Sequence, residues 1–220
     1  TPLTGFRTFM KVKKEKKKKF EYQPFFSEDV GSPDRNMYVG MNEVEIEDIN
    51  DHLGLQTNVL YFNLVGESFP GLVRQVTFTN MKGQSLELDL LDGPVKFLPY
   101  GVSDTAMKNL PTTEEAWFKV YNMEEDQTLP FYHETSSTAD TDIVTPIVKG
   151  NFAFSWLSSG ERLPYLADPD VVFGWDKTMT EARNFLSNDL ETLMNKTQSA
   201  IARTPIALAG ASVSLENKGD

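Results

Sequence analysis

Cysteine is absent from this chain of 220 residues, which excludes disulfide bonds and thiolate metal sites. Long hydrophobic runs are absent too: no stretch of about 18 apolar residues could cross a membrane as a helix. Histidine is scarce, and the two that occur, His52 and His133, are too far apart to form a paired zinc motif. We therefore expect no membrane span and no metal site, and we predict no cofactor.

Charge is plentiful but unevenly placed. The net charge is −11, although residues 11–19 contain seven Lys and one Glu. A body this acidic repels nucleic acid and anionic membranes, so neither is expected as a partner. No aromatic or Arg side chain interrupts the lysine run, which favours a solvated edge hairpin over a nucleic-acid site.

Short segments with period-two alternation predict the fold. Apolar residues make up 40% of the chain, enough for a core. Turn residues recur about every ten positions, which is typical of a sandwich rather than of βαβ units. The segments expected to be strands are 6–12, 18–25, 37–46, 57–65, 72–79, 84–91, 117–122, 131–135, 143–149, 151–156 and 211–215. We predict a mainly β, antiparallel supersandwich of two packed sheets, forming a single domain over residues 1–220.

Local patterns add one hairpin and two helices to this prediction. Residues 72–79 and 84–91 alternate on either side of an Asn80–Gly83 turn, which predicts a hairpin. Ser103 or Asp104 caps a short expected helix that ends at Pro111. A long helix is expected from about Lys177 to Ala200, because Thr178 and Glu181 have capping-box spacing and apolar residues recur at steps of three and four.

No catalytic motif is found. The segment Gly66–Gly71 comes nearest to G-x-S-x-G but its second Gly is one residue late, and no phosphate-binding glycine loop occurs. Carboxylates are numerous, so solvated turns are favoured over a catalytic pair. The Asp168–Asp170 segment could supply oxygen ligands to Ca²⁺, but Asp-Pro-Asp is also an ordinary turn, which we favour.

Aromatic side chains are the best candidates for ligand contact. Trp and Tyr rings can stack on sugar rings, although such residues also fill cores. The aromatics considered are Tyr100, Trp117, Tyr132, Trp156 and Trp175. We select Trp175, Tyr132 and Tyr100 as carbohydrate-contact residues. Trp175 is expected to be the most exposed, because it lies between Phe173–Gly174 and the expected helix.

Five short motifs between Gly71 and Phe185 occur in an order typical of one family. They are Leu72-Val73-Arg74 with Thr77-Phe78-Thr79-Asn80, Leu90-Leu91-Asp92-Gly93, Leu98-Pro99-Tyr100-Gly101, Gly150-Asn151-Phe152-Ala153-Phe154 and Asp170-Val171-Val172-Phe173-Gly174. This half of the chain resembles the N-terminal β-sandwich domain of glycoside phosphorylases of the cellobiose phosphorylase type and their hydrolase relatives. None of the motifs is a catalytic signature.

The resemblance implies a place for the chain in a larger enzyme. Such a sandwich precedes an (α/α)₆ barrel that carries the catalytic residues, shapes the rim of the substrate pocket and contributes to a homodimer interface. It also implies carbohydrate as the ligand and a cytoplasmic location. The start at Thr1 and an end on a strand that enters a turn agree with the expectation that the chain is a fragment.

Three functions therefore remain open from the sequence. The first is a non-catalytic domain of a carbohydrate-active enzyme. The second is a free-standing carbohydrate-binding module, with Trp175 and Tyr132 as its stacking platform. The third is a structural or assembly domain that binds no sugar.

Overall fold

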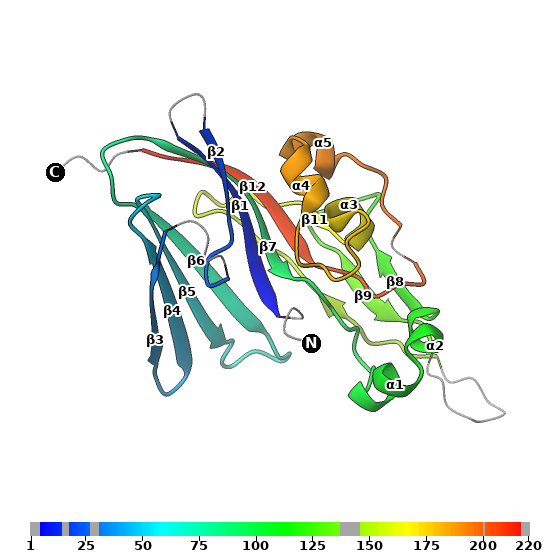
Figure 1. Cartoon of the computed structure of the whole chain (residues 1–220). Helices are drawn as coiled ribbons and strands as arrows, with labels where there is room; N and C mark the ends of the chain where they lie inside the picture. The colour runs from blue at the N-terminus through cyan, green and yellow to red at the C-terminus, as the bar shows by residue number, and fades with distance from the viewer. Residues whose placement is uncertain (1–4, 15–17, 27–30, 137–145, 200, 217–220) are drawn as a thin grey trace. The chain divides into compact units, whose positions relative to one another are not determined.

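The protein is mainly β in the computed structural model, which describes residues 5–14, 18–26, 31–136, 146–199 and 201–216 (Figure 1). Its strands form antiparallel sheets, consistent with a β-sandwich, which confirms the predicted fold class. The chain divides into two compact units, residues 1–8 with 90–211 (unit 1) and residues 9–89 with 212–220 (unit 2). Across the described residues, no helix is both long and apolar enough to cross a membrane.

The described strands form three sheets. Their bounds are β1 Phe6–Lys14, β2 Lys18–Tyr22, β3 Asp34–Val39, β4 Glu43–Asn50, β5 Leu55–Asn63, β6 Leu72–Asn80, β7 Leu86–Pro94, β8 Phe118–Tyr121, β9 Phe131–Glu134, β10 Asn151–Phe152, β11 Tyr165–Leu166 and β12 Leu208–Leu215. The sheet orders are β11-β12-β7-β1-β2, β10-β9-β8 and β3-β4-β5-β6. Strands β1, β7 and β12 contribute residues to both units.

The lysine run lies in the predicted hairpin. Strands β1 and β2 pair antiparallel from Met10↔Tyr22 to Lys14↔Lys18, and β2 is the edge strand of its sheet. Lys11, however, is only 2% exposed, and its ammonium lies 3.6 Å from the Asp89 carboxylate. The expectation of a uniformly solvated run is therefore wrong at Lys11, because the neighbouring strand β7 supplies an acid, Asp89, that pairs with it. Residues 15–17 of the run lie outside the described residues.

The four-stranded sheet differs from the sequence expectation at both ends. Residues 37–46 form two strands rather than one, because the chain reverses after Gly40, whose N–H donates to the Glu43 carbonyl at 2.9 Å. Strand β6 pairs along its whole length with β5. The predicted hairpin of β6 with β7 is therefore wrong: β7 lies in the five-stranded sheet, where Leu86 and Leu88 are buried.

Five short helices complete the described chain. They are α1 Asp104–Asn109, α2 Pro111–Glu115, α3 Pro169–Phe173, α4 Arg183–Ser187 and α5 Leu190–Met194. Helix α1 confirms the predicted short helix, and the Ser103 hydroxyl accepts its capping hydrogen bond from Ala106 N–H at 3.0 Å. Helix α1 ends before Pro111, and Pro111 occupies the first position of the next helix, α2.

The expected long helix from Lys177 to Ala200 is wrong. Only α4 and α5 form in this part of the described chain, and Asn188 between them is extended. Asn and Asp side chains compete for backbone hydrogen bonds, and here the Asn188 amide donates to the Asn184 carbonyl at 2.7 Å. The apolar periodicity instead arises from two short helices, which bury Phe185, Leu190 and Leu193.

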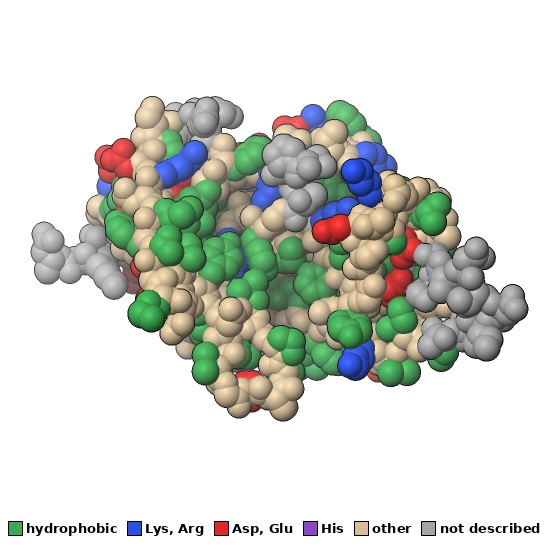
Figure 2. Space-filling view, turned by 90° about the horizontal axis from the view of Figure 1, so that it is seen from below, with side chains coloured by type: hydrophobic (Ala, Val, Ile, Leu, Met, Phe, Trp, Pro, Cys, Tyr) green, Lys and Arg blue, Asp and Glu red, His purple; other side chains and the backbone are tan. Residues whose placement is uncertain are grey.

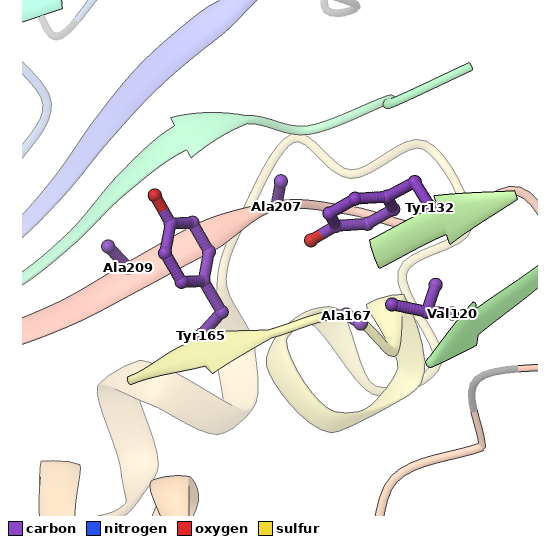
Figure 3. Close-up of a cluster of buried hydrophobic side chains, with 6 residues drawn as sticks. All are labelled: Val120, Tyr132, Tyr165, Ala167, Ala207 and Ala209. Carbon is purple, nitrogen blue, oxygen red and sulfur yellow. The ribbon is translucent and has the colours of Figure 1, made fainter. Parts of the chain in front are cut away.

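Tyr132 belongs to a core cluster of unit 1 (Figure 3). The ring is 0% exposed, and its hydroxyl donates to the Ile206 carbonyl at 3.1 Å. The other buried members of the cluster are Val120, Tyr165, Ala167, Ala207 and Ala209. A buried Tyr of this kind stabilises the fold through packing and one satisfied hydrogen bond.

Candidate functional site

The three-stranded sheet of unit 1 separates a core face from an outer face. Along β8 and β9 the residues alternate: Phe118, Val120, Tyr132 and Glu134 are buried, whereas their neighbours are partly or fully exposed. Because successive side chains of a strand point to opposite faces, the exposed set lies on one side of the sheet. That outer set consists of Lys119 and Tyr121 on β8, Phe131 and His133 on β9, and Phe152 on β10.

The segment 151–156 extends the exposed aromatic surface. Phe152, Phe154 and Trp156 are 57%, 57% and 56% exposed. Between them, Ala153 packs against the core cluster, and the Ser155 hydroxyl lies 2.6 Å from the Tyr165 hydroxyl. The alternation therefore holds the three large rings in solvent while the small residues anchor the backbone.

The rings of this surface form two neighbouring groups along the chain, one on the three-stranded sheet and one on segment 154–156. Tyr121, Phe131 and Phe152 are direct cross-strand neighbours, with ring centroids 6.2 Å apart for the first pair and 4.6 Å for the second. Phe154 and Trp156 are stacked with centroids 5.2 Å apart. We call these five residues the aromatic row. Isolated exposed apolar residues need no explanation, but a contiguous group of large rings marks a binding surface.

The polar groups beside the aromatic row are basic. Lys119 Nζ lies 4.4 Å from the Tyr121 ring centroid, and the His133 ring stacks on Phe131 with centroids 5.6 Å apart. The His133 Nε2 atom lies 2.5 Å from the Ile147 carbonyl oxygen. The only carboxylate on the described strands of this sheet, Glu134, points to the core face. The outer face therefore differs in charge from the strongly acidic chain around it.

Trp175 lies exposed on the loop that follows α3. Its side chain is 74% exposed, and the Arg183 guanidinium carbon lies 4.1 Å from its ring centroid. Such a cation–π contact fixes the indole plane and covers one of its faces. Trp175 thus has the exposure expected from the sequence, and its other face is the one that a ligand could use.

Asp176 organises the loop behind Trp175. Its carboxylate accepts hydrogen bonds from the N–H groups of Thr178, Thr180 and Glu181 at 2.9–3.0 Å. Although burial by itself raises the pKa of Asp176, the hydrogen bond from the Thr178 hydroxyl and these N–H bonds outweigh it and lower that pKa. The predicted capping box of Thr178 and Glu181 is therefore replaced by an aspartate-centred turn.

Arg7 anchors the same loop from strand β1. Its guanidinium donates to the carbonyls of Met179 and Thr180, the second at 2.8 Å. Burial lowers the pKa of Arg7 to about 10, against the raising effect of the nearby Asp176 carboxylate. The base of the Trp175 loop is therefore held by several polar contacts.

Tyr100 and Tyr132 have opposite environments. Tyr100 is 50% exposed, with Lys149 Nζ at 5.5 Å from its ring centroid. The buried Tyr132 ring offers no face on which a sugar could stack, so the expected platform of Trp175 and Tyr132 is not formed (Figure 3). The ring contacts of Trp175 and Tyr100 are made with different partners, Arg183 and Lys149.

The carboxylates of the Asp168–Asp170 segment bind neighbouring groups of the protein itself. The Asp168 carboxylate accepts from the Asp170 and Ser199 N–H groups and from Arg203 at 2.7–2.9 Å. Asp170 also binds Lys177 and Arg203. The carboxylates thus cap α3 and form ion pairs, so the expected solvated turn is wrong at Asp168, which is buried at a helix N-terminus. No metal-binding group of three or more His, Cys, Asp or Glu side chains occurs within the described ranges.

Sequence reasoning missed most of the aromatic row. Trp156 was considered, but Tyr121, Phe131, Phe152 and Phe154 were not. The signal was present in the strict alternation of Asn151–Trp156, which identifies outward-facing aromatics once the inward positions are seen to be small or polar. Figure 2 shows hydrophobic side chains, in green, at many places on the face seen from below.

Comparison with known proteins does not identify a family for this chain. No protein-family model matches the chain, and a search of the curated proteins finds no match. The functional argument therefore depends on the geometry of the exposed rings and on the resemblance carried by the motifs between Gly71 and Phe185.

Proposed function

We propose that this chain is a non-catalytic, carbohydrate-contacting domain of a carbohydrate-active protein. The observation that carries this proposal is the aromatic row on the outer face of the three-stranded sheet. Sugar rings present flat C–H faces that stack on aromatic rings, and a series of neighbouring rings suits a chain of sugar units. Lys119, Tyr121 and Trp156 supply nearby hydrogen-bonding groups for hydroxyls.

The wider assignment comes from the family resemblance. It supports a parent enzyme of the glycoside phosphorylase or hydrolase type, with catalysis in an (α/α)₆ barrel and this domain at the rim of the substrate pocket. The same resemblance supports a cytoplasmic location. The roles of Trp175 and Tyr100 as additional sugar contacts belong to this proposal, and they are supported by their exposure.

Isothermal titration calorimetry against a panel of soluble β-glucans and xylans tests the proposal. The wild-type chain should give measurable heat with at least one glycan. The double variant Phe152→Ala/Trp156→Ala should bind at least tenfold more weakly, which is about 1.4 kcal/mol. Phe69→Ala is the matched control, because Phe69 is also 57% exposed but lies on unit 2. Equal binding by the double variant, or no heat with any glycan, would contradict the proposal.

A second candidate is an assembly domain, supported by the edge of the four-stranded sheet. Every residue of β3 is exposed, and apolar side chains gather at the turns of the same sheet. Val39, Met41 and Val65 are 73%, 101% and 87% exposed. Edge strands of this kind are prone to pair with another chain, here a second copy. Sedimentation equilibrium should detect a dimer, and Val39→Lys should dissociate it; a monomer at all concentrations rules the candidate out.

A further inference from the structure

Three rings of the aromatic row lie side by side on neighbouring strands. The register pairs Tyr121 of β8 with Phe131 of β9, and Phe131 with Phe152 of β10. Their ring centroids are 6.2 Å and 4.6 Å apart, and Tyr121 and Phe152 are 36% and 57% exposed. We call these three residues the cross-strand row. A ligand that contacts all three rings must run across the strands rather than along one of them.

Gly150 makes room for the central ring of the cross-strand row. A Cβ at this position would lie 2.5 Å from Phe131 Cζ and 2.5 Å from the Tyr132 carbonyl oxygen. The Phe131 ring therefore lies against the backbone of Gly150, in space that the side chain of any other residue would need. Aromatic rings that pack over glycines of a neighbouring strand stabilise sheets. Here the same packing holds the Phe131 ring close to the sheet.

Two neighbouring side chains restrict the motion of these rings. The His133 ring stacks on Phe131 with an interplanar angle of 21°, and its Nε2 atom lies 2.5 Å from the Ile147 carbonyl oxygen. Because this nitrogen already contacts the backbone, His133 acts as a support for Phe131. Lys119 Nζ lies 4.4 Å from the Tyr121 ring centroid and places an ammonium donor beside the row. A surface preorganised in this way loses little conformational entropy when it binds a ligand.

We infer that the cross-strand row binds an unbranched, extended chain of at least three β-linked glucose units, which lies across β8, β9 and β10. Neighbouring strands are ~4.8 Å apart, close to the length of one sugar unit in an extended chain, so consecutive units meet consecutive rings. Glucose has only equatorial hydroxyls, so both faces of each unit are flat. The inference rests on the proposed carbohydrate contact and adds to it the shape, length and direction of the bound chain.

The second group of rings lies beside one end of the cross-strand row. Phe154 and Trp156 follow Phe152 by two and four residues. Because alternate residues of an extended segment point to the same side, this group flanks the β10 end of the row. A trisaccharide covers the cross-strand row alone, whereas a longer chain can also reach Trp156.

Isothermal titration calorimetry of the full chain with glucose, cellobiose and cellotriose tests the inference. The dissociation constant should fall about tenfold with each added unit, because each ring then holds one more unit of the same chain. Cellotriose should bind Phe152→Ala no more tightly than cellobiose binds the wild type. Maltotriose, whose α-linked chain curls, should bind the wild type about tenfold more weakly than cellotriose. Equal affinity for glucose, cellobiose and cellotriose, or for cellotriose and maltotriose, would overturn the inference and leave the proposed carbohydrate contact intact.

Phe154→Ala is the matched control for the direction of the chain. Phe154 is also 57% exposed and lies two residues from Phe152 on the same segment. This variant should bind cellotriose as tightly as the wild type. An equal loss of affinity in Phe152→Ala and Phe154→Ala would place the chain along segment 151–156 and overturn the inference. No heat with cellotriose while another glycan binds would also overturn it alone, whereas no heat with any glycan would overturn the proposed function as well.

Discussion

At the scale of single residues, a few buried charges hold unit 2 together. Asp48 is 0% exposed and accepts from the Tyr22 hydroxyl, from Phe25 N–H and from Arg35 Nε, the last two at 2.9 Å. These contacts tie β2, β3 and β4 through one carboxylate. Sequence alone could not identify this acid, because nothing distinguishes Asp48 from the other acids of the alternating segment 43–50.

Asp48→Ala should destabilise the protein by about 3–5 kcal/mol, because it leaves buried polar partners without their acceptor. Urea unfolding monitored by circular dichroism measures this change. Glu67→Ala, which removes an exposed acid, should shift the midpoint little. A loss below 1 kcal/mol for Asp48→Ala would show that the contacts contribute little to stability.

Asp89 makes stability depend on pH in the acidic range. Burial by itself raises its pKa, but the hydrogen bond from Ser212 at 2.8 Å and the charges of Lys11 and Lys13 outweigh burial, so the pKa lies below its usual 3.8. The unfolded chain then binds a proton more readily than the folded one. The contribution is present above pH 3.8 and is lost as the pH falls below it. Asp89→Asn should therefore flatten the acid limb of the thermal stability curve, and an unchanged limb would contradict this.

At the scale of elements, alternation predicted most strands, whereas helical periodicity failed for the long helix. The expected strand 143–149 is wrong in its described part, which has only an isolated bridge at Pro146, and residues 143–145 lie outside the described residues. Strands such as β5 and β6 appear close to their predicted positions, because period-two patterns over β-branched residues specify an exposed and a covered face. The pairing of strands was harder to predict, because no local sequence signal indicates that β7 pairs in a different sheet from β6. The long helix failed because polar residues at Asp176 and Asn188 capture backbone groups locally.

Gly93 is the most demanding position of strand β7. Its φ is +145°, and a Cβ there would lie 1.9 Å from the Ala207 carbonyl oxygen, just before β12. Gly93→Ala should therefore force the two backbones apart and lower the unfolding temperature by at least several degrees. Gly160→Ala, also at positive φ but with no atom within 4 Å, is the control and should cost only backbone strain. Equal shifts for the two variants would argue against the close approach.

At the scale of the whole molecule, three strands join the two compact units. Because β1, β7 and β12 run from one unit into the other, separating the units would break strands rather than a linker. We therefore expect one cooperative unfolding transition in differential scanning calorimetry. Asp48→Ala in unit 2 and Gly93→Ala in unit 1 should each shift that single transition. Two resolved transitions, with only one shifted by each variant, would contradict this expectation.

The central claim is that the aromatic row contacts carbohydrate, and the three tryptophans provide a direct test of it. A variant with Trp117→Phe and Trp175→Phe retains Trp156 as its only indole, so its emission reports on the row. Titration with a soluble β-glucan oligosaccharide should shift this emission to shorter wavelength and saturate, because a stacked sugar removes water from the ring. No change up to millimolar oligosaccharide, in a variant whose circular dichroism matches the wild type, would contradict the account.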